Sequence, residues 1–159
     1  MDVDARVTLD RFDRAILEAL QENADRPVVD IAESIGLSPP ACYRRIRRLE
    51  VARVIERRIA VVRPRTLGWP ISMVVMVALE REDARTMREL RTALLAAPEV
   101  VEAWNVTGEH DLVVRVVARD MESYEEMAHR LFASNERVRS FQTLVVLREM
   151  KQLSPVPAS

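Results

Sequence analysis

The sequence predicts an α+β protein of two domains, a three-helix helix-turn-helix domain followed by a ferredoxin-like βαββαβ sandwich domain. Three observations predict this fold. Apolar residues recur at helical spacing in the first third of the chain, and at strand spacing in much of the second half. The three glycines, at positions 36, 68 and 108, fall between these patterned segments. Finally, nine arginines lie between residues 38 and 65, although the net charge of the chain is −1.

Composition limits the class of protein. The 159 residues are 48% hydrophobic and 31% charged, which is typical of one ordinary folded domain or two small ones. No apolar run approaches the ~18 residues that span a bilayer, and the N-terminus is too acidic for a signal peptide. The single cysteine, Cys42, cannot form an internal disulfide. We therefore expect a cytoplasmic protein that has no membrane segment.

The charge is distributed unevenly along the chain. Residues 1–37 carry a net charge of −5, residues 38–65 carry +7 and residues 66–159 carry −3. A basic segment within an acidic chain indicates a polyanionic partner such as DNA. Lys151 is the only lysine, so the arginine excess also fits a genomic preference for arginine over lysine. That preference explains the residue type but not the clustering.

Two short helices are expected before residue 37. The first begins near Leu9, and Asp10 is placed to cap its N-terminus. The second ends at Gly36, because glycine is favoured just after a helix. Each helix has one apolar face, formed by Leu9, Phe12, Ile16 and Leu20 in the first and by Val28, Ile31, Ala32 and Ile35 in the second. These faces predict a small core between the helices.

A third helix is expected to begin abruptly at Pro39, because proline suits the first helical position and Ser38 is a favoured N-cap. A thin apolar stripe of Cys42, Ile46 and Leu49 would face the first two helices. The opposite side of the helix is broad and cationic. With the tight turn before it, this helix matches the DNA-reading helix of a helix-turn-helix domain that spans residues 1–55.

The candidate DNA-binding residues lie at the start and on the outer side of this third helix. They are Ser38, Pro40, Tyr43, Arg44, Arg47 and Arg48. For the arginines the alternative is a merely solvated surface, and for Ser38 it is a role as a cap only. Arg45 lies toward the side of the helix, where an internal ion pair is the alternative to a DNA contact.

The second half of the chain alternates between strand and helix patterns. Residues 56–70 are expected to form a strand or linker segment, residues 71–153 a domain for ligand sensing and oligomerisation, and residues 154–159 a tail. The expected strands are 71–80, 100–107, 111–119 and 138–150, and the expected helices are 83–98 and 120–134. This order is the split βαβ arrangement, in which both helices cover one face of a four-stranded sheet.

The expected strands are apolar on both faces. In the third strand, Val113 and Val117 point away from the side that carries Leu112, Val114 and Val116. Two helices cover only one face, and a bare apolar sheet favours aggregation. We therefore expect the open face to pack against a second copy of the chain. Such a symmetric homodimer would present two reading helices to two half-sites on double-stranded DNA.

Four motifs, taken in order, resemble the leucine-responsive/asparagine-responsive regulator family, written Lrp/AsnC, of bacterial and archaeal transcription regulators. They are LDRFDRAILEALQENADR at 9–26, VVDIAESIGLSPPACYRRIRRLE at 28–50, VTGEHDLVVRV at 106–116 and TLVVLREMKQ at 143–152. The resemblance implies an N-terminal DNA-binding domain. It also implies a C-terminal domain that dimerises, assembles further to tetramers or octamers, and binds a small-molecule effector, usually an amino acid, where dimers meet.

The resemblance implies that two segments supply the effector site. They are the loop Val106, Thr107, Gly108, Glu109, His110 and Asp111, and the last-strand residues Thr143, Leu144, Val145 and Val146. The loop chemistry is compatible, because Gly108 lets the backbone approach a ligand and Asp111 can accept hydrogen bonds from an ammonium group. A plain hairpin turn is the alternative interpretation. We expect no metal or other cofactor, because His110 and His129 are isolated.

The chain departs from the family pattern at several positions. Arg53 stands near the place where the family usually has glycine, and Arg57 with Arg58 near the place of a glycine–aromatic pair. Leu112 replaces a frequent tyrosine and Phe141 a frequent threonine, both close to the expected effector site. These two departures bear on the identity of the effector and on whether one binds.

We expect a sequence-specific DNA-binding transcription regulator whose assembly or DNA affinity responds to an amino acid. A ligand-independent architectural DNA-binding protein is the alternative, and the departures near the effector site favour it. An enzyme built on Glu109, His110 and Asp111 is disfavoured, since no nucleophile–base pair or cofactor loop is visible. We therefore expect no enzymatic activity.

Overall fold

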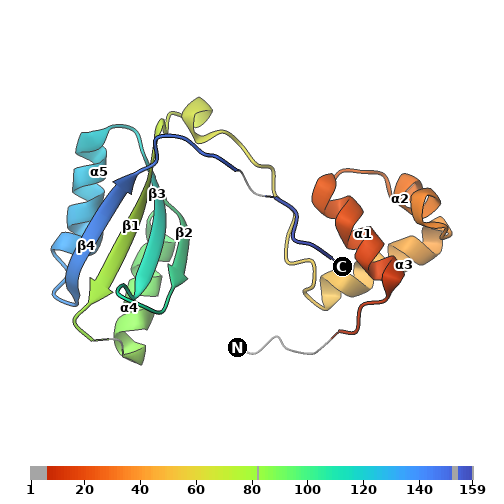
Figure 1. Ribbon diagram of the computed structural model, residues 1–159, viewed down its shortest axis with the longest axis horizontal. Helices are drawn as coiled ribbons and strands as arrows, with labels where there is room; N and C mark the ends of the chain where they lie inside the picture. Colours follow the sequence, from red (N-terminus) through yellow and green to blue (C-terminus); the bar gives the residue numbers. More distant parts are fainter. Residues whose placement is uncertain (1–6, 82, 152–153, 159) are drawn as a thin grey trace. The chain divides into compact units, whose positions relative to one another are not determined.

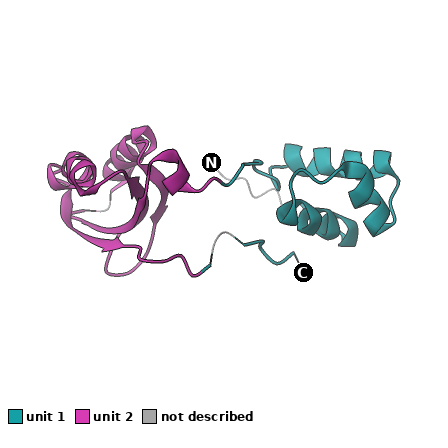
Figure 2. Cartoon of the chain, turned by 90° about the horizontal axis from the view of Figure 1, so that it is seen from above, with its two compact units in different colours: residues 1–61, 151–159 teal, residues 62–150 magenta. Residues whose placement is uncertain are grey.

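The computed structural model describes residues 7–81, 83–151 and 154–158. The chain divides into two compact units, one formed by residues 1–61 with 151–159 and the other by residues 62–150 (Figure 2). No helix within the described residues is both long enough and apolar enough to cross a membrane.

The first unit contains three helices. They are α1 (Arg11–Glu22), α2 (Val28–Ile35) and α3 (Pro39–Val51). Asp10 caps α1 as expected, because its carboxylate accepts a hydrogen bond from the backbone N–H of Asp13, and the Asp13 carboxylate accepts one from Asp10 in return. Gly36 ends α2 in the left-handed conformation with a φ of 71°. Ser38 occupies the N-cap position of α3, although its side chain forms no capping hydrogen bond.

The core of this unit lies where the three helices meet. The apolar stripe predicted for α3 is confirmed, because Cys42, Ile46 and Leu49 are each at most 3% exposed. They pack with Ile16, Ala19, Ile31 and Ala32 from the other two helices. Burial raises the pKa of the Cys42 thiol, so this cysteine is a packing residue with little thiolate at neutral pH.

The second unit is a four-stranded antiparallel sheet with two helices on one face (Figure 1). Its elements are β1 (Ile71–Leu79), α4 (Ala84–Ala96), β2 (Val100–Asn105), β3 (Leu112–Ala118), α5 (Met121–Ala128) and β4 (Val138–Val145). The strand order β2-β3-β1-β4 confirms the predicted ferredoxin-like βαββαβ arrangement. Leu90 and Leu94 of α4 and Met127 of α5 pack against alternate residues of β1 and β3, such as Val75 and Val114.

Element boundaries differ from the prediction in three places. The expected helix 120–134 changes at His129 into one π-helical turn, η2 (His129–Ala133), which buries the neighbouring side chains Leu131 and Phe132 together. The expected strand 138–150 stops at Val145, because the neighbouring strand β1 begins at Ile71 and offers little further backbone for pairing. In the linker, residues 56–63 have no regular secondary structure, and η1 (Pro64–Leu67) is a short 3₁₀ helix.

The C-terminal residues lie with the first unit. The side-chain amide of Gln21 on α1 donates to the backbone carbonyl of Val156 at 3.0 Å and accepts from its N–H at 2.7 Å. The guanidinium of Arg14 donates to the carbonyl of Ala158. The sequence predicted residues 154–159 as a tail. In the structure, Val156 and Ala158 of this segment hydrogen-bond to side chains of α1.

The face of the sheet opposite α4 and α5 is apolar and partly exposed, as the strand pattern predicted. Trp104 on β2 is paired with Val113 on β3, and Val74 on β1 is paired with Leu144 on β4. Trp104 is 47% exposed and Leu144 is 45% exposed. Packing of a second copy on this face stays a prediction.

Candidate DNA-binding and effector sites

The candidate DNA-binding residues lie at the start and on one side of α3. Ser38, Pro40, Tyr43, Arg44, Arg47 and Arg48 all lie at the start or on the outer side of α3, and all are exposed. Pro39 and Pro40 begin the helix three residues after Gly36, and both are exposed at its first turn. This placement suits a helix whose N-terminal half enters the major groove of DNA.

The arginines of α3 differ in their partners. Arg45 binds two carboxylates on α1, Asp10 at 2.7 Å and Asp13 at 2.9 Å, so the internal ion pair considered for it is present. Arg48 also donates to Asp13. The hydrogen bond from the Asp13 backbone N–H, with help from Arg45, lowers the pKa of the Asp10 carboxyl. Two of the four arginines are therefore bound to α1.

Asp13 is the residue that sequence reasoning missed. Its side chain is fully buried, and it joins the cap of α1 to two arginines of α3. A signal for it exists in the sequence, because Asp13 lies between Phe12 and Ile16 on the apolar side of a helix. A carboxylate in such a position must be paired or pay a large desolvation cost. The cationic partner could not be identified without knowing how α1 and α3 cross.

The outermost arginines are the freest to bind phosphate. Arg47 forms an ion pair with one carboxylate oxygen of Glu50 at 3.0 Å, one turn along α3. Arg58 forms an ion pair with the other oxygen of Glu50 at 3.1 Å. Within the described residues, Arg44 has no carboxylate within ion-pairing distance, and its side chain is exposed. Exposed ion pairs such as Arg47–Glu50 are weak and exchange readily for a phosphate. Arg44 and Arg47 are therefore the strongest phosphate-binding candidates on α3.

Arg53 follows α3 in the left-handed backbone conformation. Its φ is 56°, and it is the only non-glycine residue with a positive φ in the described chain. Its N–H donates to the carbonyl of Glu50, and the N–H of Val54 donates to Leu49, which closes the helix. Glycine adopts this conformation without steric cost, which accounts for the glycine expected near this position from the family resemblance.

Replacement of Arg53 by glycine should stabilise the first unit. Removing Cβ relieves a steric cost of about 1 kcal/mol at a left-handed position. Urea unfolding followed by far-UV circular dichroism measures the change. Arg53→Ala is the matched control, because it removes the same charge but keeps Cβ. Equal stability of the two variants would show that the charge, rather than the backbone, sets the effect.

The candidate effector loop connects β2 to β3. It is closed by a hydrogen bond from the N–H of Val106 to the carbonyl of Asp111 at 2.9 Å. Gly108 at its tip has a φ of 133°, and a Cβ there would meet no atom within 4 Å. Asp111 is already engaged, because one carboxylate oxygen accepts from the N–H of Leu79 at 2.7 Å. An ammonium group of a ligand would therefore bind the other carboxylate oxygen.

The second candidate segment lies along β4, away from the loop. Val145 pairs with Met73 near the start of β1, whereas Asp111 donates its N–H to Val77 near the end of that strand. Four residues of strand correspond to ~13 Å, and β3 and β4 flank opposite sides of β1. Within one chain the structure therefore does not bring the two segments into a common cavity.

Individual side chains of the second segment have different surroundings. Thr143 hydrogen-bonds to the hydroxyl of Tyr124 on α5, whereas Leu144 and Val145 are about half exposed and Val146 is half-buried. Of the two departures from the family pattern, Leu112 lies in the core and Phe141 packs against it. Leu112 is 4% exposed, and the ring of Phe141 lies 5.6 Å from that of Phe132. Among the described residues, no cluster of three or more histidine, cysteine or acidic side chains is arranged to hold a metal ion.

Comparison with protein-family models matches both units. Residues 9–50 match the AsnC-type helix-turn-helix domain, and residues 72–156 match the Lrp/AsnC ligand binding domain. A relative from Sinorhizobium fredii, an uncharacterised HTH-type transcriptional regulator, is 40% identical over 97% of this chain and 91% of its own length. The leucine-responsive regulatory protein of Rhizobium meliloti is 32% identical over 95% of this chain and 97% of its own.

Solved structures share the fold over nearly the whole chain. A transcriptional regulator from Neisseria meningitidis, in complex with L-methionine, has a TM-score of 0.86 and 28% identity. It covers 94% of this chain, and 97% of its own chain is covered. An AsnC family regulator from Agrobacterium tumefaciens has a TM-score of 0.85 and 30% identity, with the same coverage.

Proposed function

The chain belongs to the Lrp/AsnC family of transcriptional regulators, and on this basis we propose that it is a sequence-specific DNA-binding homodimer whose assembly or DNA affinity responds to an amino acid. The exposed cationic surface of α3 is the observation that supports the proposed DNA binding. Arg44 and Arg47 supply charge for phosphates, while Pro40 and Tyr43 stand on the first turns, where base edges are within reach.

Dimerisation would double this surface. The open apolar face of the sheet, with Trp104 and Leu144 about half exposed, supports a second copy as its cover. A two-fold axis then places two copies of α3 toward two half-sites about one helical turn of DNA apart. The tetramers or octamers implied by the family resemblance would extend this arrangement along DNA.

The DNA-binding part is tested by electrophoretic mobility shift with the full chain. We expect a DNA fragment from upstream of its own coding region to be shifted at lower protein concentration than an unrelated fragment of equal length. Equal shifts for both fragments would leave only non-specific binding, and no shift at moderate salt would reject DNA binding altogether.

The effector part rests on the ligand-binding family model and on the geometry of the candidate loop. The Neisseria relative was crystallised with L-methionine, which supports an amino acid as the class of effector. Along β1 in one chain, Asp111 of the loop lies ~7 Å from Thr143 and ~13 Å from Val145, and β3 and β4 flank opposite sides of β1. We infer that the site is completed where copies meet, so that binding changes assembly and thereby DNA affinity.

Gly108→Ala should abolish the response to the effector while leaving the fold intact. A φ of 133° is unfavourable for alanine, so the loop must change, yet the added Cβ meets no neighbouring atom. The measurement is the rise in melting temperature across the twenty amino acids, because a ligand that binds only the folded state stabilises it. Gly68→Ala is the matched control, since Gly68 also has a positive φ, 83°, but follows η1 instead of lying in the loop.

The same screen separates the two candidate functions. A specific amino acid that stabilises the wild-type chain, but not Gly108→Ala, supports the effector-responsive regulator. If no amino acid stabilises the wild type, the result supports the alternative, an architectural DNA-binding protein without an effector. The separation of the two candidate segments within one chain is the structural observation that favours this alternative. In either case we propose a role at the nucleoid in the cytoplasm of a bacterial or archaeal cell, with no enzymatic activity, cofactor or metal.

A further inference from the structure

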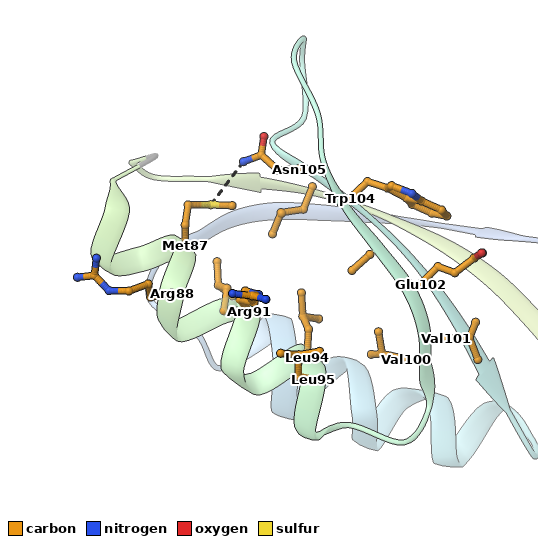
Figure 3. A pocket seen from close by; sticks show the side chains of 13 residues that line it. Met87, Arg88, Arg91, Leu94, Leu95, Val100, Val101, Glu102, Trp104 and Asn105 are labelled. Carbon is orange, nitrogen blue, oxygen red and sulfur yellow. Dashed lines mark hydrogen bonds between the residues drawn. The ribbon is translucent and has the colours of Figure 1, made fainter. Parts of the chain in front are cut away.

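A groove of about 460 Å³ runs between α4 and β2, the edge strand of the sheet (Figure 3). Its floor is apolar and includes Leu90 and Leu94 from the helix and Val100 and Leu112 from the strands. Ala103, in the middle of β2, is small and exposed, and it leaves the groove open. The volume is within the range of small-molecule sites, and the floor suits an apolar ligand.

Two arginines line the same groove. Arg88 and Arg91 lie one turn apart on α4, and both are exposed. In the described part of the chain, neither has a carboxylate within ion-pairing distance. The acid between them in the sequence, Glu89, is bound by Arg85 at 2.9 Å and by Arg137 at 2.7 Å. The groove therefore combines an apolar floor with two cations that lack an internal counter-charge.

The only acidic residue among the described groove residues is Glu102. It pairs with Arg115 at 2.8 Å, and its side chain points away from α4 (Figure 3). An ammonium group bound in this groove would therefore find no carboxylate, and it would be desolvated near two arginines. The groove therefore suits a ligand without an ammonium group better than a zwitterionic amino acid.

We propose that the groove binds a small hydrophobic monocarboxylate that has no ammonium group. Its apolar body would lie between α4 and β2, and its carboxylate would bind Arg88 and Arg91, whose planar guanidinium groups match carboxylate geometry. This site is separate from the proposed amino-acid site and does not depend on it. Asn105 and Leu112 line the groove and flank the loop 106–111, so the ligand would also contact the base of that loop.

A second copy of the chain is a poorer occupant of the groove. A two-fold contact centred here would bring Arg88 and Arg91 close to their own symmetry copies, which is repulsive. On the other apolar surface of this unit, the open face of the sheet, Arg115 is paired with Glu102 at 2.8 Å and with Glu149 at 3.5 Å, and this face is already the expected contact between copies. Charge complementarity thus favours an anion.

The experiment is isothermal titration calorimetry of the full chain with three probes that share the phenylpropyl skeleton. These are 3-phenylpropanoate, the alcohol 3-phenylpropan-1-ol, which lacks the carboxylate, and L-phenylalanine, which adds the ammonium group. We expect saturable binding of 3-phenylpropanoate that is at least about tenfold tighter than binding of the alcohol. No saturable binding of the acid, or equal binding of the acid and the alcohol, would overturn the proposal.

Substitutions of groove residues test whether 3-phenylpropanoate binds in the groove. Ala103→Leu should fill the groove and abolish 3-phenylpropanoate binding, and Arg88→Gln with Arg91→Gln should weaken it at least about tenfold. Arg85→Gln with Arg130→Gln is the matched control, because it removes two surface arginines that do not line the groove. Any binding of L-phenylalanine that survives Ala103→Leu belongs to the separate effector site.

Two outcomes of the variants would contradict the site. Unchanged binding of 3-phenylpropanoate to Ala103→Leu would place the ligand elsewhere. If Ala103→Leu instead dissociated the native assembly, as measured by sedimentation velocity, the groove would be an interface between copies of the chain. Ala103 is exposed and lies on the edge strand, so we expect this variant to fold. Circular dichroism of the ligand-free variant checks its folding.

Discussion

Asp13→Ala should unfold the first unit at far lower urea concentration than the wild type requires, while the second unit keeps its stability. Asp13 is fully buried and binds both Arg45 and Arg48. Removing Asp13 should cost about 3 kcal/mol, because its hydrogen bonds to Arg45 and Arg48, each worth about 1.5–3 kcal/mol, are lost together, although Arg45 keeps Asp10. That loss is comparable with the whole stability expected of a domain of this size, at about 0.05–0.15 kcal/mol per residue.

The positions of the two tryptophans allow the unfolding of the two units to be measured separately. Both tryptophans, Trp69 and Trp104, belong to the second unit, so their fluorescence reports only that unit. Circular dichroism at 222 nm reports the helices of both units. We expect the mutation to move the dichroism transition to lower urea and to leave the fluorescence transition in place.

Asp30→Ala is the control for the loss of a carboxylate. Asp30 is exposed in the first turn of α2, where a carboxylate contributes about 0.3–1 kcal/mol through the helix dipole. A loss of stability for Asp13→Ala no larger than that for Asp30→Ala would contradict a structural role for the buried network. A coincident shift of the fluorescence transition would mean that the two units unfold together.

Much of the fold could be predicted because its signals are local. Gly36 and the Ser38–Pro39 pair mark the turn of the helix-turn-helix, and the spacing of Cys42, Ile46 and Leu49 assigns the buried side of α3. In the second unit, the alternation of strand and helix patterns was enough to establish the βαββαβ order.

What could not be predicted depends on how distant segments meet. The pairing of Asp13 with Arg45 and Arg48 requires the crossing of α1 over α3, and a helix-face argument that considered α3 alone placed Arg48 simply outward. The separation of loop 106–111 from residues 143–146 follows from their positions along β1, which sequence order does not fix. The groove has a related origin. Its walls α4 and β2 are consecutive elements, but its floor includes Leu112 of β3, and only the packing of α4 on the sheet decides whether the space between them stays open.

The ion pairs of α3 divide its arginines into a pair bound to α1 and an outer pair that we propose to face DNA, and the double variant Arg44→Ala with Arg47→Ala tests this proposal. Arg45 and Arg48 are bound to α1, whereas Arg44 has no carboxylate partner in the described chain and Arg47 has only the exposed Glu50. Removing a structural arginine should therefore lower stability. Removing the outer pair should lower DNA affinity and leave the unfolding curve nearly unchanged.

The expected loss follows from counterion release. Each phosphate contact contributes about −0.9 to the slope of log K against log salt, so a dimer that loses four contacts should show a slope flatter by about 3–4. We expect DNA affinity at low salt to fall at least about a hundredfold, as measured by fluorescence anisotropy with a labelled duplex over a series of salt concentrations. Arg85→Ala with Arg130→Ala removes the same charge from the second unit and should leave the slope unchanged. If this control flattened the slope as much as the α3 variant, the effect would reflect net charge, and the outer surface of α3 would not be the surface that meets DNA.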